Sequence, residues 1–219
     1  MIKKTVFTAL LALGFLACDE VTEQQQLPVW GNPQIKERVV NGETVYDTIP
    51  HTVGYFRLVN QDSTIITPEL LAGKIYVADF FFTSCISICP TMSMQMKRVY
   101  DRFESRDSVA IVSFSIDPEY DNVEVLSEYA GRLGATSDTW HFLTGDKDEI
   151  YDLAFNSYMT QRPADDPADA NNILHSGAFI LIDTQKRIRG VYDGTIAEQV
   201  DLLMKDIDRL LKEEHANTL

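Results

Sequence analysis

Two cysteines lie four residues apart in the stretch FFTSCISICP, residues 81–90, where an apolar run ends and a proline follows. Side chains at positions i and i+4 lie on the same side of a helix, so the sulfurs of Cys85 and Cys89 could both turn toward one ion. The same thiols could instead exchange disulfides with another protein. A structural disulfide across so short a loop would gain little from chain entropy. The cysteines alone therefore leave metal binding and thiol exchange as equal alternatives.

The first 17 residues have the features of a secretory signal peptide. MIKK supplies positive charge, TVFTALLALGFLA is apolar, and the small Ala17 precedes Cys18. The apolar run is shorter than the ~20 residues of a spanning helix. The stretch FLAC is similar to a bacterial lipobox, whose cysteine carries lipid after cleavage. We expect lipidation of Cys18 and export to the periplasmic side of a bacterial membrane; the alternative is a signal-peptide cysteine without a role.

The rest of the chain is predicted to form one domain on a tether. The polar run DEVTEQQQ, followed by Pro28 and Pro33, predicts a tether over residues 18–34 and a domain over residues 35–215. Loss of residues 1–17 removes two lysines and leaves 17 basic residues against 33 acidic ones, a net charge of −16. Such a surface repels nucleic acid and anionic lipid, so we expect no nucleic-acid partner. It would tolerate a cation or a basic partner, although solubility explains it equally well.

The N-terminal half of the domain should begin with β-structure. Asn41-Gly42 lies between two β-forming runs and predicts a hairpin, and YFRLVNQDSTII predicts a second. Thr67-Pro68 should open a short helix that ends at Gly73. KIYVADFFF is almost continuously apolar, which is typical of a strand covered on both faces.

The cysteines should then lead into a helix that starts at Pro90 and buries Met94, Val99 and Phe103. Four further elements are predicted after it: a buried strand in VAIVSFSI, a helix capped by Asp or Asn that ends at Gly134, a short strand in HFLT, and a helix in GDKDEIYDLAFNSY. A long polar loop, a hairpin of GAFILID with RIRGVYD, and a final helix in TIAEQVDLLMKDIDRLLKEE follow. Strands that alternate with helices indicate an α/β layered domain with a central mixed sheet.

A strand that ends in a cysteine pair at a helix start is the thioredoxin arrangement, and four blocks resemble the Sco/SenC family within that fold. DFFFTSCISICPTM is similar to its signature FxFTxCxxxCPxxM, and SIDPEYDNVEVLSEYA to SxDPxxDTPxxLxxYA. WHFLTG is similar to WxxLTG, and NILHSGAFILID to the segment that carries its copper-binding histidine. The blocks follow the family's order over about residues 50–210. The resemblance implies a thioredoxin-like three-layer fold with a central mixed sheet, here extended by an N-terminal β-hairpin.

The resemblance also implies a copper site of Cys85, Cys89 and His175. Thiolates suit Cu(I), imidazole also suits Cu(II), and a helix N-terminus favours the thiolate form. Ordinary thioredoxin-like reductases place a cis-proline before the hairpin strand, whereas LHSGA contains no proline. The presence of His175 at this position therefore favours metal binding over disulfide reduction. The long loop before it, residues 156–174, suggests that His175 moves in when copper arrives. Between the cysteines the chain departs from the family, because it lacks the usual Pro and Asp.

Three acidic residues are candidates for tuning the site or for a partner surface. Asp79, six residues before Cys85, could be a buried acid that tunes Cys89 or a partly wet strand-end residue. Asp117 and Asp121 match acids that the family uses near its site, although helix capping is the stronger expectation for Asp121. His141 should pack in the core, and His51 and His215 lie outside the matched segments. Met92, Met94 and Met96 would point in different directions on a helix, which favours packing.

These features together predict an exported copper protein that serves the dinuclear copper site of cytochrome c oxidase. Its partners would be the copper-accepting oxidase subunit or another copper chaperone, and a lipid anchor would hold it at the membrane. It would act mainly by binding and transfer. The alternative is a thiol-disulfide oxidoreductase, in which Cys85 attacks a partner disulfide and Cys89 resolves the mixed disulfide.

Overall fold

The computed structural model describes residues 26–159 and 177–217, and it is built around a seven-stranded mixed sheet. The strands lie in the order β4-β3-β7-β6-β5-β8-β9. The central strands β5, β6 and β7 run parallel, while β8, β9, β3 and β4 are antiparallel to their neighbours. Their bounds are β3 Leu58–Asn60, β4 Ile65–Ile66, β5 Ile75–Phe81, β6 Val109–Ser115, β7 Trp140–Thr144, β8 Ala178–Ile182 and β9 Ile188–Asp193. Every residue of β5 and β6 is buried, as their continuous apolar runs predict.

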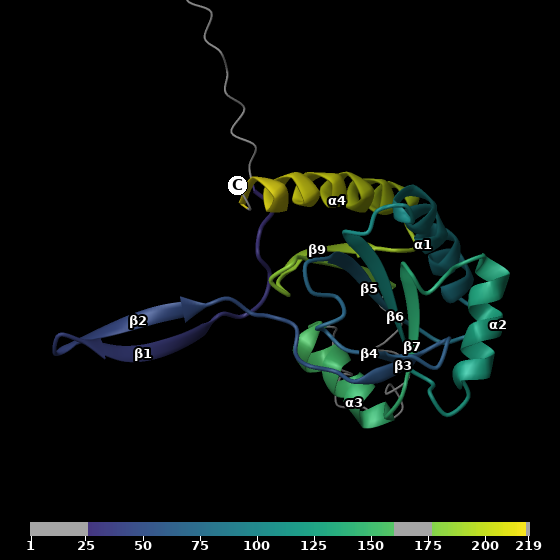
Figure 1. The fold of residues 1–219 in the computed structure, drawn as a ribbon, viewed down its shortest axis with the longest axis horizontal. Helices are drawn as coiled ribbons and strands as arrows, with labels where there is room; N and C mark the ends of the chain where they lie inside the picture. The colour runs from purple at the N-terminus through teal and green to yellow at the C-terminus, as the bar shows by residue number, and fades with distance from the viewer. Residues whose placement is uncertain (1–25, 160–176, 218–219) are drawn as a thin grey trace, which may run out of the picture.

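Helices cover both faces of this sheet (Figure 1). The helices α1 Cys89–Phe103, α2 Val123–Leu133 and α4 Ala197–Asn217 pack on one face around one apolar cluster. The helix α3 Lys147–Asp152 and the π-helical turn η1 Leu153–Ser157 pack on the other face around a second cluster. The thioredoxin-like three-layer arrangement is therefore confirmed. None of the described helices is long and apolar enough to cross a membrane.

The ends of the helices around the site follow their sequence signals. Asn122 caps α2 by accepting a hydrogen bond from the backbone N–H of Val125, and Gly134 ends that helix at φ +64°. The helix α1 begins at Cys89 with Pro90 in its first turn. The prediction that Met94 is buried was wrong, since its side chain is 65% exposed. Met92 and Met96 occupy the buried side of α1 instead.

Residues 67–73 do not form the predicted helix. The backbone N–H groups of Leu70, Leu71 and Ala72 each donate to the carbonyl three residues earlier, which gives consecutive tight turns. Gly73 follows at φ +76°, a conformation that glycine adopts without strain. The N-terminal proline signal was correct, but the segment ends before an α-helical turn closes.

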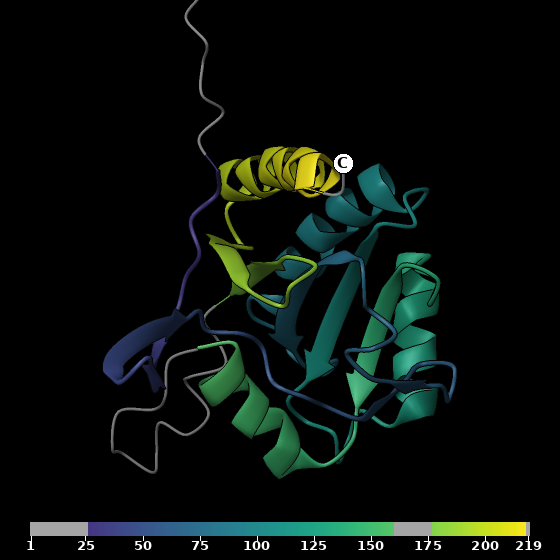
Figure 2. The same ribbon diagram turned by 60° about the vertical axis from the view of Figure 1, so that its left-hand side comes forward.

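The predicted N-terminal hairpin is present as a separate two-stranded sheet. Strands β1 Gln34–Val40 and β2 Glu43–Ile49 pair antiparallel, from Gln34 opposite Ile49 to Val40 opposite Glu43. Asn41 and Gly42 join them with φ values of +52° and +85°, as a type I′ turn requires. The hairpin projects away from the body of the molecule in both views (Figures 1 and 2).

Part of the segment that we predicted as tether is bound to the domain. Arg189, buried on β9, donates to the carbonyl oxygens of Leu27 at 2.6 Å and Pro28 at 3.2 Å. The same guanidinium contacts Glu213 on α4 at 2.8 Å, and Glu213 accepts from the N–H of Leu27 at 2.9 Å. Trp30 N–H donates to the Ile188 carbonyl at 2.8 Å. Residues 27–30, which lie within the predicted tether, are therefore held to the domain, because their backbone groups bind partners there.

Replacing Arg189 by Ala should lower the free energy of unfolding by about 3 kcal/mol, because the carbonyls of Leu27 and Pro28 lose their donor and a buried ion network loses its centre. The matched control is Arg102→Ala, which breaks the exposed pair with Asp208 and should cost less than ~1 kcal/mol. Urea denaturation of both variants measures the difference. Equal, small losses would contradict the importance of this buried network.

Candidate metal and thiol site

The two cysteines lie where β5 gives way to α1. Cys85 follows a short loop after β5, and its backbone N–H donates to the Phe82 carbonyl at 3.2 Å. Cys89 is the first residue of α1. Both thiols are free and buried, and each is among the groups that shift the pKa of the other. The sequence spacing thus places two sulfurs together at a helix N-terminus.

Asp121 holds the cysteine loop to the neighbouring strand. Its carboxylate accepts hydrogen bonds from the backbone N–H of Thr83 at 3.0 Å, from the Thr83 hydroxyl, and from the Ser115 hydroxyl at 2.6 Å. The expectation that Asp121 caps α2 was wrong, because Asn122 performs that role. Asp121 is fully buried and fixes the loop two residues before Cys85. The serine that ends the apolar strand VAIVSFS was the available sequence signal for this contact.

The environment gives the two thiols different acidities. Burial opposes ionisation of Cys85, but hydrogen bonds from Cys89 and Ser87 outweigh it and lower its pKa from the ordinary value. The Ser87 hydroxyl lies 3.5 Å from the Cys85 sulfur. Burial raises the pKa of Cys89 to about 12. The hydrogen bond to Cys85 and the nearby charges of Cys85 and Asp79 act in the same direction. Cys85 is therefore the thiol that ionises first.

Asp79 is a buried acid beneath this pair. It accepts a hydrogen bond from the Ser113 hydroxyl at 2.5 Å, and the Trp140 indole N–H donates to Ser113 at 2.9 Å. Burial raises the pKa of Asp79 to about 7, although the Ser113 bond opposes that rise. Because the folded protein holds this proton more tightly than the unfolded chain, Asp79 reduces stability progressively as pH rises from about 4 to 7. In the sequence, Ser113 is marked only as a polar residue within an apolar strand.

The other candidates are scattered. Asp117 is half-buried, and its backbone N–H donates to Ser115. His141 lies half-buried on β7, where burial lowers its pKa to about 4; His51 contacts the Ser157 carbonyl at 2.7 Å. Within residues 26–159 and 177–217, no three His, Cys, Asp or Glu side chains form a group suited to a metal ion. His175 and Cys18 lie outside the described residues.

The sheet brings Gly177, the first described residue before β8, close to the cysteine loop. Strand β8 pairs antiparallel with β5, with Ile180 opposite Ala78, so β8 begins at the edge where β5 ends. A Cβ atom placed on Gly177 would lie 3.9 Å from the side chain of Ile88. Gly177 therefore lies beside the residue that precedes Cys89.

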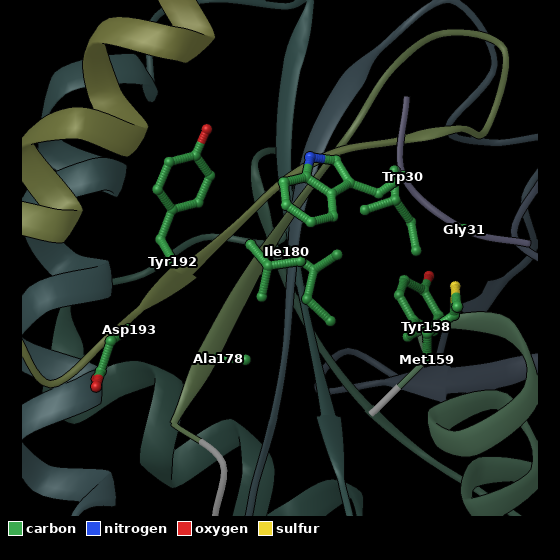
Figure 3. A pocket seen from close by; sticks show the side chains of 10 residues that line it. Trp30, Gly31, Tyr158, Met159, Ala178, Ile180, Tyr192 and Asp193 are labelled. Atoms are coloured by element: carbon green, nitrogen blue, oxygen red, sulfur yellow. The ribbon is translucent and has the colours of Figure 1, made fainter. Parts of the chain in front are cut away.

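A separate hollow of about 550 Å³ lies against β8 and β9 (Figure 3). Trp30, Tyr158, Met159 and Ile180 give it a mainly apolar lining, with Asp193 at its border. Neither Cys85 nor Cys89 lines it. The candidate chemistry therefore lies at the cysteine loop and not in this cavity.

In the reduced, metal-free protein, iodoacetamide should alkylate Cys85 at least about a hundredfold faster than Cys89 at pH 7.5. A pKa near 12 leaves Cys89 with less than about a thousandth of the thiolate that Cys85 carries. The Cys85 thiolate is the less basic and so the weaker nucleophile of the two, but this offsets only part of its larger population. Peptide mass spectrometry of quenched samples measures both rates. Equal rates, or faster alkylation of Cys89, would contradict the acidity order.

The chain is similar in sequence and in fold to proteins of known structure. The structure of BsSco, a member of the Sco family of cytochrome c oxidase assembly proteins, is 30% identical with a TM-score of 0.62 over 72% of this chain and 92% of that one. A SCO1/SenC family lipoprotein from Bacillus anthracis str. Ames is 28% identical with a TM-score of 0.63 over 74% and 95%. Arabidopsis thaliana ScoI with copper bound is 26% identical with a TM-score of 0.57 over 72% and 99%. The SCO1/SenC family profile matches residues 46–212, and the chain belongs to this family.

Proposed function

We propose that the protein binds one copper ion through Cys85, Cys89 and His175 and passes it to a partner during assembly of a respiratory oxidase. The observation that carries this proposal is the pair of adjacent thiols, one of them acidified, at the sheet edge where Gly177 also lies. Thiolate sulfur is a soft donor that suits Cu(I), and imidazole extends the site to Cu(II). The donor set therefore fits copper as a cargo.

Covalent geometry supports His175 as the third ligand. It is two residues before Gly177, and an extended chain spans at most ~3.6 Å per residue. Its Cα is thus within about 7 Å of a glycine whose own neighbour is Ile88. Ile88 directly precedes Cys89, so an imidazole at position 175 has the reach that the proposal needs.

Relatives supply the biological setting. BsSco belongs to a family of cytochrome c oxidase assembly proteins, and the Arabidopsis ScoI structure holds copper. By analogy, we propose the copper-accepting subunit of an oxidase, or another copper chaperone, as the partner. Ile86 between the cysteines is 96% exposed and offers an apolar contact there, within a strongly acidic chain that suits a basic partner surface. Cargo would move by exchange of one thiolate ligand for another.

The acidity difference between the thiols also supports a second function, thiol-disulfide exchange. The Cys85 thiolate would attack one sulfur of a partner disulfide, and the other partner sulfur would leave as a thiolate. Cys89 would then lose its proton and attack Cys85, which releases the partner as a dithiol and leaves a Cys85–Cys89 disulfide. Two electrons pass from this protein to the partner. Asp79 beneath the pair, with a pKa of about 7, would accept the Cys89 proton.

Replacing His175 by Ala separates the two functions. The reduced variant, titrated anaerobically, should bind copper about tenfold to a hundredfold more weakly, because one ligand is gone. The loss of affinity should be larger for Cu(II) than for Cu(I). Its thiol exchange with a model disulfide should stay within about twofold of the original rate. His215→Ala, at an exposed position on α4, is the control and should change neither property. Unchanged copper affinity in His175→Ala would show that His175 is not a copper ligand.

We also propose that lipid on Cys18 anchors the domain, with residues 1–17 removed as a signal peptide. The Bacillus anthracis relative is a lipoprotein, and the described segment that follows Cys18 is bound to the domain from Leu27 onward. An anchored domain of about residues 35–215 would then stay close to its membrane partners.

Replacing Cys18 by Ala should move the protein from the membrane fraction to the soluble exported fraction and abolish incorporation of labelled fatty acid, because the acyl acceptor is gone. Fractionation and metabolic labelling measure the two effects. Cys85→Ala should remain lipidated. A Cys18→Ala protein that still sediments with membranes after a carbonate wash would refute the lipid anchor.

A further inference from the structure

The hairpin β1–β2 exposes large apolar and aromatic side chains to solvent. Ile35, Val39 and Tyr46 are between 64% and 72% exposed, and no residue of either strand is buried. A two-stranded sheet alone in water is marginally stable, and its unpaired edges are templates for another strand. We propose that strand β2 pairs antiparallel with β2 of a second copy of this chain, so that two hairpins form one four-stranded sheet.

The open edge of β2 has a defined set of free backbone groups. Val40 and Glu43 close the type I′ turn, and the closing pair of such a hairpin exchanges both of its hydrogen bonds. Hydrogen-bonded and non-hydrogen-bonded pairs then alternate along the ladder. The N–H and C=O groups of Thr44, Tyr46 and Thr48 consequently point away from β1 toward solvent. Three residues on the open edge are therefore ready to pair.

A two-fold axis through Tyr46 matches this edge to itself. It places Tyr46 opposite Tyr46 of the second copy and Thr44 opposite Thr48, which are favourable aromatic and hydroxyl pairs. On the other face, Val45 meets Asp47 and Glu43 meets Ile49, so no like charges lie directly opposite. Asp47 is already paired with Arg38 at 2.5 Å within its own hairpin. Shifting the axis by one residue would oppose Glu43 to Asp47, or Asp47 to itself, and the charges thereby select one register.

Strand β1 is unsuited to the same pairing. A two-fold axis at its centre, Glu37, would oppose Glu37 to itself and Lys36 to Arg38. Shifts of one residue would oppose Lys36 to Lys36 or Arg38 to Arg38. Like charges directly opposite each other destabilise a sheet. The hairpin therefore has one protected edge and one self-complementary edge, and pairing through β2 alone closes at a dimer.

The shape of the molecule leaves room for this contact. The hairpin stands clear of the helices and the main sheet in both views (Figures 1 and 2). Antiparallel pairing places the tip of each hairpin beside the base of the other, because Glu43 meets Ile49. The two domains then lie at opposite ends of the shared sheet, and neither cysteine loop takes part.

Cysteine cross-linking tests the register. Directly opposite residues of a hydrogen-bonded pair have Cα atoms about 5.5 Å apart, which suits a disulfide. In the full-length protein with Cys85→Ser and Cys89→Ser, Tyr46→Cys should give a disulfide-linked dimer under mild oxidation. Glu37→Cys, directly opposite Tyr46 across the hairpin, is the matched control and should stay largely monomeric. Equal cross-linking of both variants, or none in Tyr46→Cys, would overturn the proposal.

Proline substitution tests the pairing without new thiols. Thr48→Pro removes an outward N–H and should weaken the dimer on the order of tenfold or more, because each copy loses a donor at the interface. Ile35→Pro lies directly opposite, carries the same local backbone cost, and should change the dissociation constant by no more than about twofold. Sedimentation velocity of the full-length protein in mild detergent measures both. A protein that is monomeric at every concentration, or equal weakening by both prolines, would contradict the β2 interface.

Discussion

The buried pairing of β5 with β6 on one side and with β8 on the other is the constraint on which the rest of the structure depends. It runs from Ile75 opposite Val109 to Phe81 opposite Ser115, with Ile180 opposite Ala78 on the other side. Because a slip of one residue would turn every side chain to the wrong face, the two apolar clusters fix this register. Three segments distant in sequence then meet at one edge: the cysteine loop, the turn that carries Asp121, and the start of β8. The site follows from that meeting.

Burial at this edge makes the thiols unequal. Cys89 and Asp79 are buried where charge is poorly solvated, so each tends to keep its proton, while Cys85 keeps enough hydrogen bonding to release its own. Such a pair suits either a soft metal or a disulfide, and the metal requires both sulfurs to be reduced first. The N-terminal segment binds at the other end of the sheet, because Ile188 opens β9, opposite Ile182, which itself pairs with Tyr76 near the start of β5. A chain anchored through that segment would direct its cysteines away from the attachment point.

The sequence was sufficient wherever one local signal decided the outcome. Continuous apolar runs predicted β5 and β6, Asn41-Gly42 predicted the hairpin turn, and Asn with Gly bounded α2. Prediction from the sequence failed where contacts between distant segments determine the role of a residue. Asp121 lies where a helix cap is expected, but its carboxylate instead accepts hydrogen bonds from Thr83 and Ser115. Leu27 and Pro28 lie within the predicted tether, but their carbonyl groups accept hydrogen bonds from Arg189, which lies more than 150 positions later in the chain.

We propose that the sulfurs of Cys85 and Cys89 and the imidazole of His175 form a single copper site. Copper K-edge X-ray absorption of the reduced protein, loaded anaerobically with one equivalent of Cu(I), tests it most directly. We expect copper to remain bound at one ion per chain, with two sulfur neighbours and one nitrogen neighbour. Copper surrounded only by nitrogen and oxygen, or gathered in a multinuclear cluster between chains, would contradict it.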